Sequence, residues 1–331
     1  LQSPQPPPDY ARPPKKSSGG VLKVVVILLL LLLLLGAGGF FAFRSFTNKG
    51  SSTTNTGPNS GVTPTQAPLI TTPINATFNY ASVNITIINA QQATSFADDN
   101  GTLAQGMVRL NLHAVLTDVN KDFTSAPAFS YPECFTLLLP GGNKVAMRGY
   151  KDLTGPAQKE DRTTWIDFPA STNLKVNQMI LQAGKDTEEQ IQVPLTGHAD
   201  LSQYQPKQSS PNLRVKFGSL FWTLKTTTWK LSDSGTQVAK GMRFLLLSFS
   251  LDNPGTEGLN AFPPDYIRLQ YGGTTIALEQ AGIGDAAAGT TNIPGLVSFL
   301  VPQDTTTATF ILLPEHTPGA TSQATIPFQI P

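Results

Sequence analysis

The chain has 331 residues, enough for about one to three domains, and its formal net charge of +1 conceals an uneven distribution. Residues 1–50 hold six Lys/Arg residues and one acid, whereas the remaining residues hold 17 bases and 21 acids. The weakly acidic remainder argues against nucleic acid as a partner, and the single cysteine, Cys134, excludes an intrachain disulfide.

The N-terminal region predicts a membrane anchor. Residues 1–20 are rich in Pro, Gly and Ser and are expected to be a disordered tail. Residues 24–43 contain no charge and, as a helix rising about 1.5 Å per residue, would span about 30 Å of lipid. We therefore expect a transmembrane helix over 21–44, with the lipid bilayer as a partner.

The flanking cations set the expected orientation. Four Lys/Arg residues precede the apolar run and two follow it, which favours a cytoplasmic N-terminus and an extracytoplasmic remainder. An alternative is a cleaved signal peptide with its apolar region at 24–35. The apolar run continues through Phe43, which favours the uncleaved anchor, and either interpretation places the remainder outside the cytoplasm.

A stalk is expected next, over 45–73. Its later part, residues 51–73, contains ten Ser/Thr, four prolines and no charge. Such a composition cannot bury a core and is typical of an extended spacer.

From about residue 74 the pattern predicts an all-β structure. Short alternating apolar segments are bounded by Gly, Pro, Asn and Asp, and no helical periodicity lasts beyond a turn or two. The expected strands include 82–88, 107–117, 135–139, 179–181, 244–251 and 309–313. Within the second of these, Arg109, Asn111 and His113 share one face and apolar residues share the other, which predicts a half-buried antiparallel strand.

The β-rich region repeats itself with an offset of about 131–135 residues. Gly106–Leu112 matches Gly241–Leu247, and the matches continue in order through Met179–Leu181 with Phe310–Leu312 and a final strand carrying proline, Pro194 or Pro327. This predicts two tandem immunoglobulin-like antiparallel β-sandwiches, at 74–200 and 210–331, joined by a linker at 205–211.

Both units share a strand ending at an Asp or Asn turn, a segment with proline and aromatic residues, and a glycine turn. Leu251-Asp252-Asn253-Pro254 followed by Phe262–Leu269 shows this order. It resembles a bacterial family of extracellular immunoglobulin-like domains of unknown function, related in fold to a secreted immunoprotective antigen. The resemblance implies a fold and an extracytoplasmic location, and it carries over no catalytic residue.

A search for chemistry nominates no catalytic or cofactor-binding residue. The three histidines, His113, His198 and His316, are far apart, and no common catalytic or nucleotide-binding motif occurs. The weak candidate for a metal, calcium, is the D-x-N-x-D spacing of Asp118, Asn120 and Asp122, for which a solvated turn is the alternative interpretation.

Three further features have structural or chance interpretations. Cys134 is expected to be a buried small side chain. Pro-Pro-Asp-Tyr occurs at 7–10 and again at 263–266, and this recurrence shows how readily the motif arises. Glycosylation sequons begin at Asn75, Asn84 and Asn100.

The sequence therefore predicts a single-pass, cell-surface binding or structural protein that is not an enzyme and needs no cofactor. A stalk bearing two sandwiches is a geometry that presents loops to a partner, here an extracellular protein or a glycan. The alternatives are a hydrolase with its site at the joint between the domains, or an accessory subunit of an envelope complex.

Overall fold

The computed structural model describes residues 69–98, 105–116, 129–157, 160–258, 262–314 and 319–331. The predicted tail, membrane helix and nearly all of the stalk lie outside these ranges. So do Asn100, the candidate metal loop with Asp118, Asn120 and Asp122, and His316. Within the described ranges no helix is long and apolar enough to cross a membrane.

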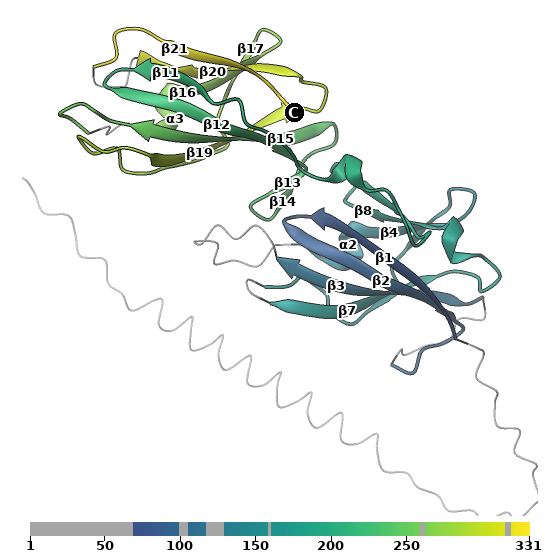
Figure 1. The fold of residues 1–331 in the computed structure, drawn as a ribbon. Coiled ribbons are helices and arrows are strands. Elements are labelled where there is room, and N and C mark those ends of the chain that lie inside the picture. Colours follow the sequence, from purple (N-terminus) through teal and green to yellow (C-terminus); the bar gives the residue numbers. More distant parts are fainter. Residues whose placement is uncertain (1–68, 99–104, 117–128, 158–159, 259–261, 315–318) are drawn as a thin grey trace, which may run out of the picture. The chain divides into compact units, whose positions relative to one another are not determined.

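The described chain is all-β and built from antiparallel sheets, as predicted. Two N-terminal sheets come first (Figure 1). One has five strands in the order β1 (Ile70–Tyr80), β2 (Val83–Ala93), β3 (Met107–Leu116), β7 (Asp161–Pro169) and β6 (Gly149–Tyr150). The other has four strands in the order β5 (Lys144–Ala146), β4 (Phe135–Leu138), β8 (Ile180–Ala183) and β9 (Ile191–Pro194).

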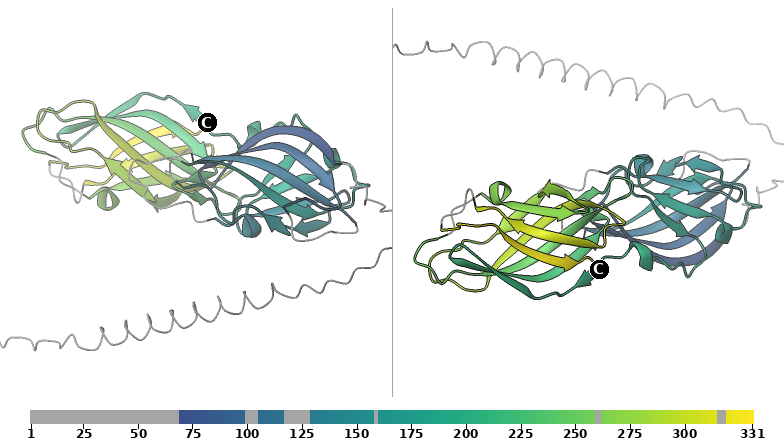
Figure 2. Two further views of the ribbon diagram at one scale, coloured as in Figure 1. Left: turned by 90° about the horizontal axis from the view of Figure 1, so that it is seen from below. Right: turned by 90° about the horizontal axis from the view of Figure 1, so that it is seen from above.

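Two C-terminal sheets follow the same plan, and both views of Figure 2 show their strands in layers. The larger sheet runs from β10 (Lys207–Ser209) and β11 (Leu213–Phe217), which both pair with β12 (Leu220–Lys230), to β15 (Met242–Asp252), β19 (Ile293–Pro302) and β18 (Gln280–Ile283). The smaller sheet has the order β17 (Thr274–Ala277), β16 (Ile267–Tyr271), β20 (Thr307–Leu312) and β21 (Ala324–Gln329).

Short elements complete the fold. They are the hairpin of β13 (Ser232–Asp233) with β14 (Thr236–Gln237), the one-turn helices α2 (Tyr131–Cys134) and α3 (Pro263–Tyr266), and the 3-10 turns η1 (Val176–Gln178) and η2 (Ser202–Tyr204). The helix α2 leads into β4, and α3 leads into β16. In the second Pro-Pro-Asp-Tyr motif the side chain of Tyr266 is fully buried and belongs to the core, whereas Asp265 is exposed.

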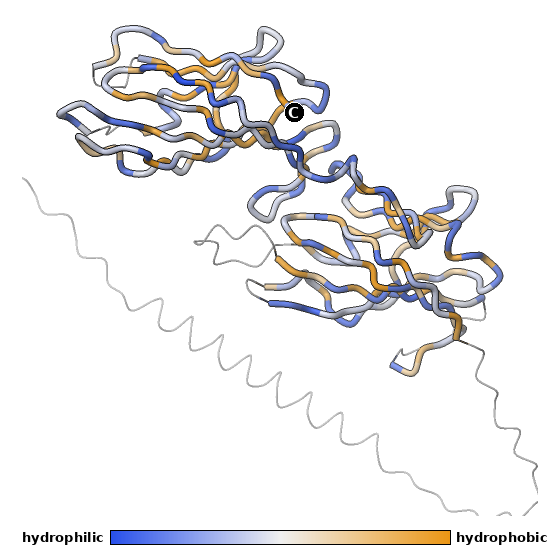
Figure 3. Tube along the Cα trace, viewed as in Figure 1, coloured by the Kyte–Doolittle hydropathy of each residue, from blue (hydrophilic) through white to orange (hydrophobic). Residues whose placement is uncertain are grey.

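Alternation of apolar residues explains how the strands face one another. In β15, Leu245, Leu247, Phe249 and Leu251 are all buried, and the residues between them are less so. Figure 3 shows that hydrophobic and hydrophilic residues both occur along the strands. Because side chains of a strand alternate between its two faces, this pattern buries one face of each sheet against the other sheet.

The strand order supports the internal repeat but corrects one matched segment. In the N-terminal sheets Leu181 lies opposite Leu137, and in the C-terminal sheets Phe310 lies opposite Leu269. Leu137 and Leu269 correspond, because each is the third residue of a strand that directly follows a one-turn helix. Pairing therefore aligns Leu181 with Phe310, whereas the sequence match aligned it with Leu312. A shift of two residues keeps each side chain on the same face, which is why alternation alone did not detect it.

Strands also extend into segments expected to be irregular. β1 begins at Ile70, inside the predicted stalk, and β10 occupies Lys207–Ser209, inside the predicted linker. Both segments are rich in polar residues, but their backbones pair with β2 and β12 respectively. Pairing with a neighbouring strand thus overrides a composition that is typical of loops.

The described residues between 69 and 331 belong to one compact unit. Within it, hydrogen bonds connect the N-terminal sheets to the β13–β14 hairpin and to the residues after it. The Ser82 amide donates to Ser232 Oγ at 3.2 Å, the Gly235 amide to Ser82 Oγ at 3.0 Å, and the Glu189 amide to the carbonyl of Val238 at 2.9 Å. The predicted domain boundaries inside this unit stay predictions.

Candidate binding groove

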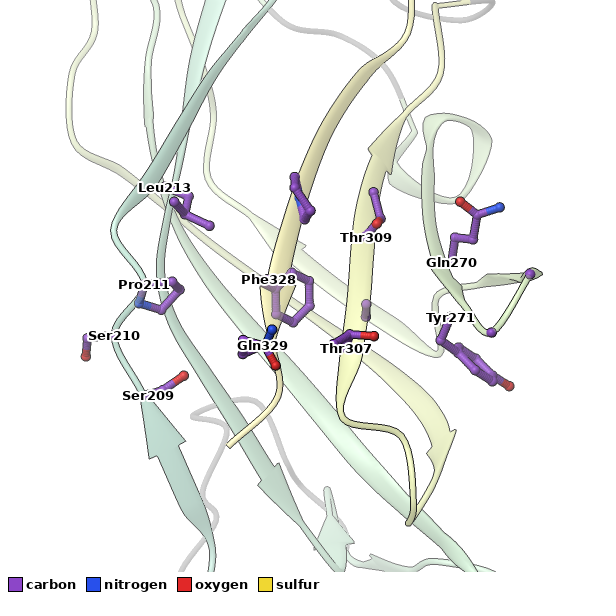
Figure 4. A pocket seen from close by; sticks show the side chains of 14 residues that line it. Ser209, Ser210, Pro211, Leu213, Gln270, Tyr271, Thr307, Thr309, Phe328 and Gln329 are labelled. Carbon is purple, nitrogen blue, oxygen red and sulfur yellow. The ribbon is translucent and has the colours of Figure 1, made fainter.

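A groove of about 870 Å³ lies over the smaller C-terminal sheet and the segment between β10 and β11 (Figure 4). Its volume is within the range of small-molecule sites. The lining residues are Ser209, Ser210, Pro211, Leu213, Gln270, Tyr271, Gly272, Gly273, Thr307, Ala308, Thr309, Pro327, Phe328 and Gln329.

Strand register explains why polar side chains meet in this groove. Gln270 of β16 pairs with Thr309 of β20, which pairs in turn with Pro327 of β21. Thr307 and Gln329 form the next row on the same face. Because these residues alternate with buried ones, the polar set faces away from the core and into the groove.

The groove is bounded on two sides. In Figure 4 the side chains of Ser209, Pro211 and Leu213 stand beside those of β21, and Gln270 and Tyr271 stand at the other side, on the β16–β17 hairpin. The turn of that hairpin contains Gly272 and Gly273, both with positive φ and with open space where a side chain would be. The groove therefore has a polar floor with apolar side chains along one wall.

The chemistry of the lining is the informative feature. Hydroxyl and amide groups supply the polar atoms, and none of the described lining residues is charged or is a histidine or cysteine. Such a surface offers hydrogen-bond donors and acceptors but no group that exchanges a proton near neutral pH. Hydrogen bonds and apolar contacts are the interactions that this lining can make with a ligand.

One edge of the groove is an edge strand. β21 pairs with β20 on one side, and the ladders of the described chain give it no partner on the other side. Pro327 removes a backbone donor from the middle of this strand. Proline in an edge strand discourages the addition of a further strand, so the edge is poorly suited to binding an extended peptide by backbone pairing.

The residues that the sequence singled out do not converge on a site. Nε2 of His113 lies 2.5 Å from Oδ1 of Asp161 on an exposed part of β3 and β7, and His198 is exposed in a turn. Within the described ranges there is no group of three or more His, Cys, Asp or Glu side chains that could hold a metal ion. Asn75 and Asn84 are exposed, as a glycosylation acceptor requires.

Cys134 is buried, as predicted, at the end of α2. Burial raises the pKa of its thiol. Its neighbour Tyr80 donates a hydrogen bond from the phenol oxygen to Oε2 of Glu188 at 2.7 Å, and burial likewise raises the pKa of Tyr80. A thiol in this environment is a packing residue and not a nucleophile.

The prediction that Arg109 lies on an exposed polar face is wrong. Its side chain is 7% exposed, because the rings of Phe96 and Trp165 cover the guanidinium at 4.0 and 3.7 Å from Cζ. Asp167 and Asp98 pair with it. The guanidinium is thus fully engaged by the protein itself and is not available to a ligand.

Comparisons with known proteins add little to this description. No protein-family model and no curated protein matches the sequence. Among solved structures, a predicted lipoprotein from Bacillus subtilis aligns with a TM-score of 0.30 and 14% identity, over 37% of this chain and 39% of the other.

Proposed function

We propose that the chain is a membrane-anchored, extracytoplasmic binding protein that presents two immunoglobulin-like β-sandwiches, and that the groove holds a neutral glycan. The single observation that carries the proposal is the uncharged lining of the groove, in which a floor of hydroxyl and amide groups lies beside an apolar wall. Sugars offer a matching surface, because their hydroxyls donate and accept hydrogen bonds while their C–H faces are apolar.

A protein partner is the less favoured occupant. Protein interfaces rely on aromatic and apolar anchors in well-packed pockets. Here the apolar wall consists of Pro211 and Leu213, of which Leu213 is 37% exposed. The aromatic lining residues are Tyr271, on the opposite side, and Phe328, which is buried. The proline in β21 also weakens the edge as a template for an added strand. Hydroxyl and amide groups on neighbouring strands suit a ligand that is itself polar and uncharged.

Affinity electrophoresis tests the groove. The full chain in neutral detergent would be run through gels containing dextran, mannan, xylan or β-glucan, with heparin as an anionic comparison. We expect retardation by at least one neutral polysaccharide and loss of that retardation by about tenfold or more in Thr309→Arg, because a long cation would fill the floor of the groove.

The matched control is Thr163→Arg, which places the same side chain on an exposed position of β7. It should be retarded like the original protein. If no neutral polysaccharide retards the protein, or if Thr309→Arg is retarded as strongly as Thr163→Arg, the glycan proposal is wrong.

A separate measurement tests the anchor. In cells, the full chain should stay with the membrane after an alkaline carbonate wash, and a protease added from outside should digest its C-terminal part. Deletion of residues 24–43 should release the protein from the membrane fraction. Release of the undeleted chain by carbonate would refute an uncleaved anchor without affecting the groove.

A further inference from the structure

Arg243 is a cation that faces the interior of the C-terminal sheets. It precedes Leu245 by two residues in β15, so both side chains are on the buried face, and Arg243 is 7% exposed. In the internal repeat its place corresponds to Val108, which is fully buried. One copy of the fold therefore carries a valine where the other carries an arginine.

Within the part of the chain that the structure describes, no carboxylate forms an ion pair with Arg243. Nη2 donates to the main-chain oxygen of Thr305, and Nε has no hydrogen-bond partner among the described residues. The ring of Trp229 lies 5.4 Å from Cζ. Burial lowers the pKa of this guanidinium, and the charge of Asp304 opposes the shift only in part.

Arg109 shows how the same chain compensates a buried arginine when it supplies the anions itself. Asp167 binds that guanidinium at two points and Asp98 at a third. Burial alone would lower the pKa of Arg109, but these two carboxylates outweigh burial and raise it. A buried charge costs stability unless it is paired. Arg109 has two paired carboxylates, whereas Arg243 has no ion pair among the described residues.

Arg243 lines a cavity of about 320 Å³ with a second cation. Lys207 pairs with Trp229 across β10 and β12, and its Nζ lies 5.5 Å from the centre of the Trp229 ring. Gln303 adds an amide to the wall, and its Nε2 donates to the carbonyl oxygen of Met242 at 3.3 Å, which uses one of its two hydrogens. Glu189 is the one carboxylate side chain in the described lining, and its Oε2 already accepts a hydrogen bond from the Gly241 amide at 2.9 Å.

We propose that this cavity binds a small oxyanion, a carboxylate or phosphate group, with Arg243 and Lys207 as its counter-charges. The guanidinium fork matches planar and tetrahedral oxyanions, and the second hydrogen of the Gln303 amide adds a further donor. The cavity is too small for a polymer, and the groove for the neutral ligand shares none of its described lining residues. The two proposals therefore stand independently.

Thermal unfolding of the full chain in neutral detergent tests the site. Sodium phosphate and sodium acetate would be titrated separately, with ionic strength held constant by sodium chloride. We expect a saturable rise of several degrees in the unfolding temperature with at least one of them, since a ligand bound by the folded state stabilises it. A response to phosphate alone assigns the phosphate class, and a response to acetate alone assigns the carboxylate class.

Two arginine variants separate a specific site from general charge effects. Arg243→Met should abolish the rise and should unfold no earlier than the original protein without anion, because it removes an uncompensated charge. Arg214→Met removes an arginine that is 52% exposed and paired with Asp252, and it should keep the rise.

Lys207→Gln tests the site even if the Arg243 variant misfolds, because Lys207 is exposed and its replacement should not disturb folding. It should weaken the apparent anion affinity by about threefold to tenfold while leaving the unfolding temperature without anion unchanged. The proposal is wrong if neither anion gives a saturable response. It is also wrong if the original protein, Arg243→Met and Lys207→Gln all respond equally.

Discussion

Arg109 and Asp167 lie opposite each other on β3 and β7 and form a two-point ion pair almost without contact with solvent. Nε donates to Oδ1 and Nη2 to Oδ2, each at 2.8 Å, and the carboxylate of Asp167 is fully buried. Asp98 completes the pairing from a position that is 54% exposed.

We expect Asp167→Asn to lower the free energy of unfolding by about 3–5 kcal/mol, because it leaves the buried guanidinium without its main counter-charge. Asp98→Asn should cost less than about 1 kcal/mol, since its carboxylate is half in water. Urea denaturation of both variants checks this. Equal losses for the two would show that burial of the pair does not determine its contribution.

The response to acid follows from carboxylates whose pKa is lowered in the folded state. For Asp98, burial opposes the shift, but the hydrogen bond and charge of Arg109 hold its pKa below the ordinary value. The pKa of Asp200 is lowered by the backbone amide of Ser202, and that of Glu160 by Arg162.

A lowered folded pKa adds stability above the unfolded pKa of about 4, and this stability is lost as the pH falls through the folded value. Unfolding free energy measured in urea should therefore change little between about pH 7 and 5 through these groups and fall below about pH 4. Asp98→Asn should reduce the slope of that fall. An identical slope in the variant would contradict the assignment.

Two matched glycines should respond differently to alanine. Gly106 and Gly241 both have positive φ, at 107° and 77°. A Cβ on Gly106 would lie 2.9 Å from the carbonyl oxygen of Ala170 and 2.6 Å from Thr172 Cγ2, whereas a Cβ on Gly241 would meet open space.

Gly106→Ala should therefore cost about 2–4 kcal/mol, and Gly241→Ala about 1 kcal/mol from backbone strain alone. Thermal unfolding of the two single variants gives the comparison directly. A larger cost at Gly241 than at Gly106 would show that close backbone contact is not the main cause of the loss.

The side chain of Asn253 forms hydrogen bonds that connect the turn after β15 to the segment around Ala286. Its amide nitrogen donates to the carbonyl oxygens of Glu257, Ala286 and Ala287 at 2.8, 2.8 and 3.1 Å, and its Oδ1 accepts from the Gly255 amide. The side chain is fully buried.

Asn253→Asp would place a carboxylate against three carbonyl oxygens. We expect a loss of about 2–4 kcal/mol in unfolding free energy at pH 7, partly recovered at low pH where the acid is protonated and donates again. Asn292→Asp, at an exposed turn, serves as the control. Loss of equal size in both would contradict the role of the buried amide.

The thiol of Cys134 should be inert while the protein is folded. It is 1% exposed, and burial raises its pKa, so little thiolate is present near neutral pH. A chromogenic disulfide reagent should react with the folded protein at less than about a hundredth of the rate at which it reacts with the unfolded chain. Rapid reaction without denaturant would show that α2 opens readily.

Local patterns predicted the strands well. β3 was recognised because apolar and polar residues alternate from Val108 to Ala114. β15 was recognised as an apolar segment that ends in a turn of recognisable composition at Asn253. The order of segments also indicated the repeat, which the matching strand order of the sheets supports.

Long-range relationships could not be predicted in this way. Arg109 resembles a surface residue in the sequence because the side chains that bury it, Phe96 and Trp165, come from separate parts of the chain. The polar floor of the groove depends on the register between β16, β20 and β21. Alternation alone does not fix this register, because a shift of two residues keeps every side chain on the same face. Arg243 left one local signal, a cation on the apolar face of a strand.

The buried position of Cys134 has a consequence for how the protein matures. With one thiol in the whole chain, none of the stability of the sheets comes from an oxidative step, so folding needs neither an oxidant nor a disulfide isomerase. Because that thiol is enclosed between α2 and the core, two folded copies do not become linked through it. Within the described residues there is thus no disulfide that a reducing agent could break.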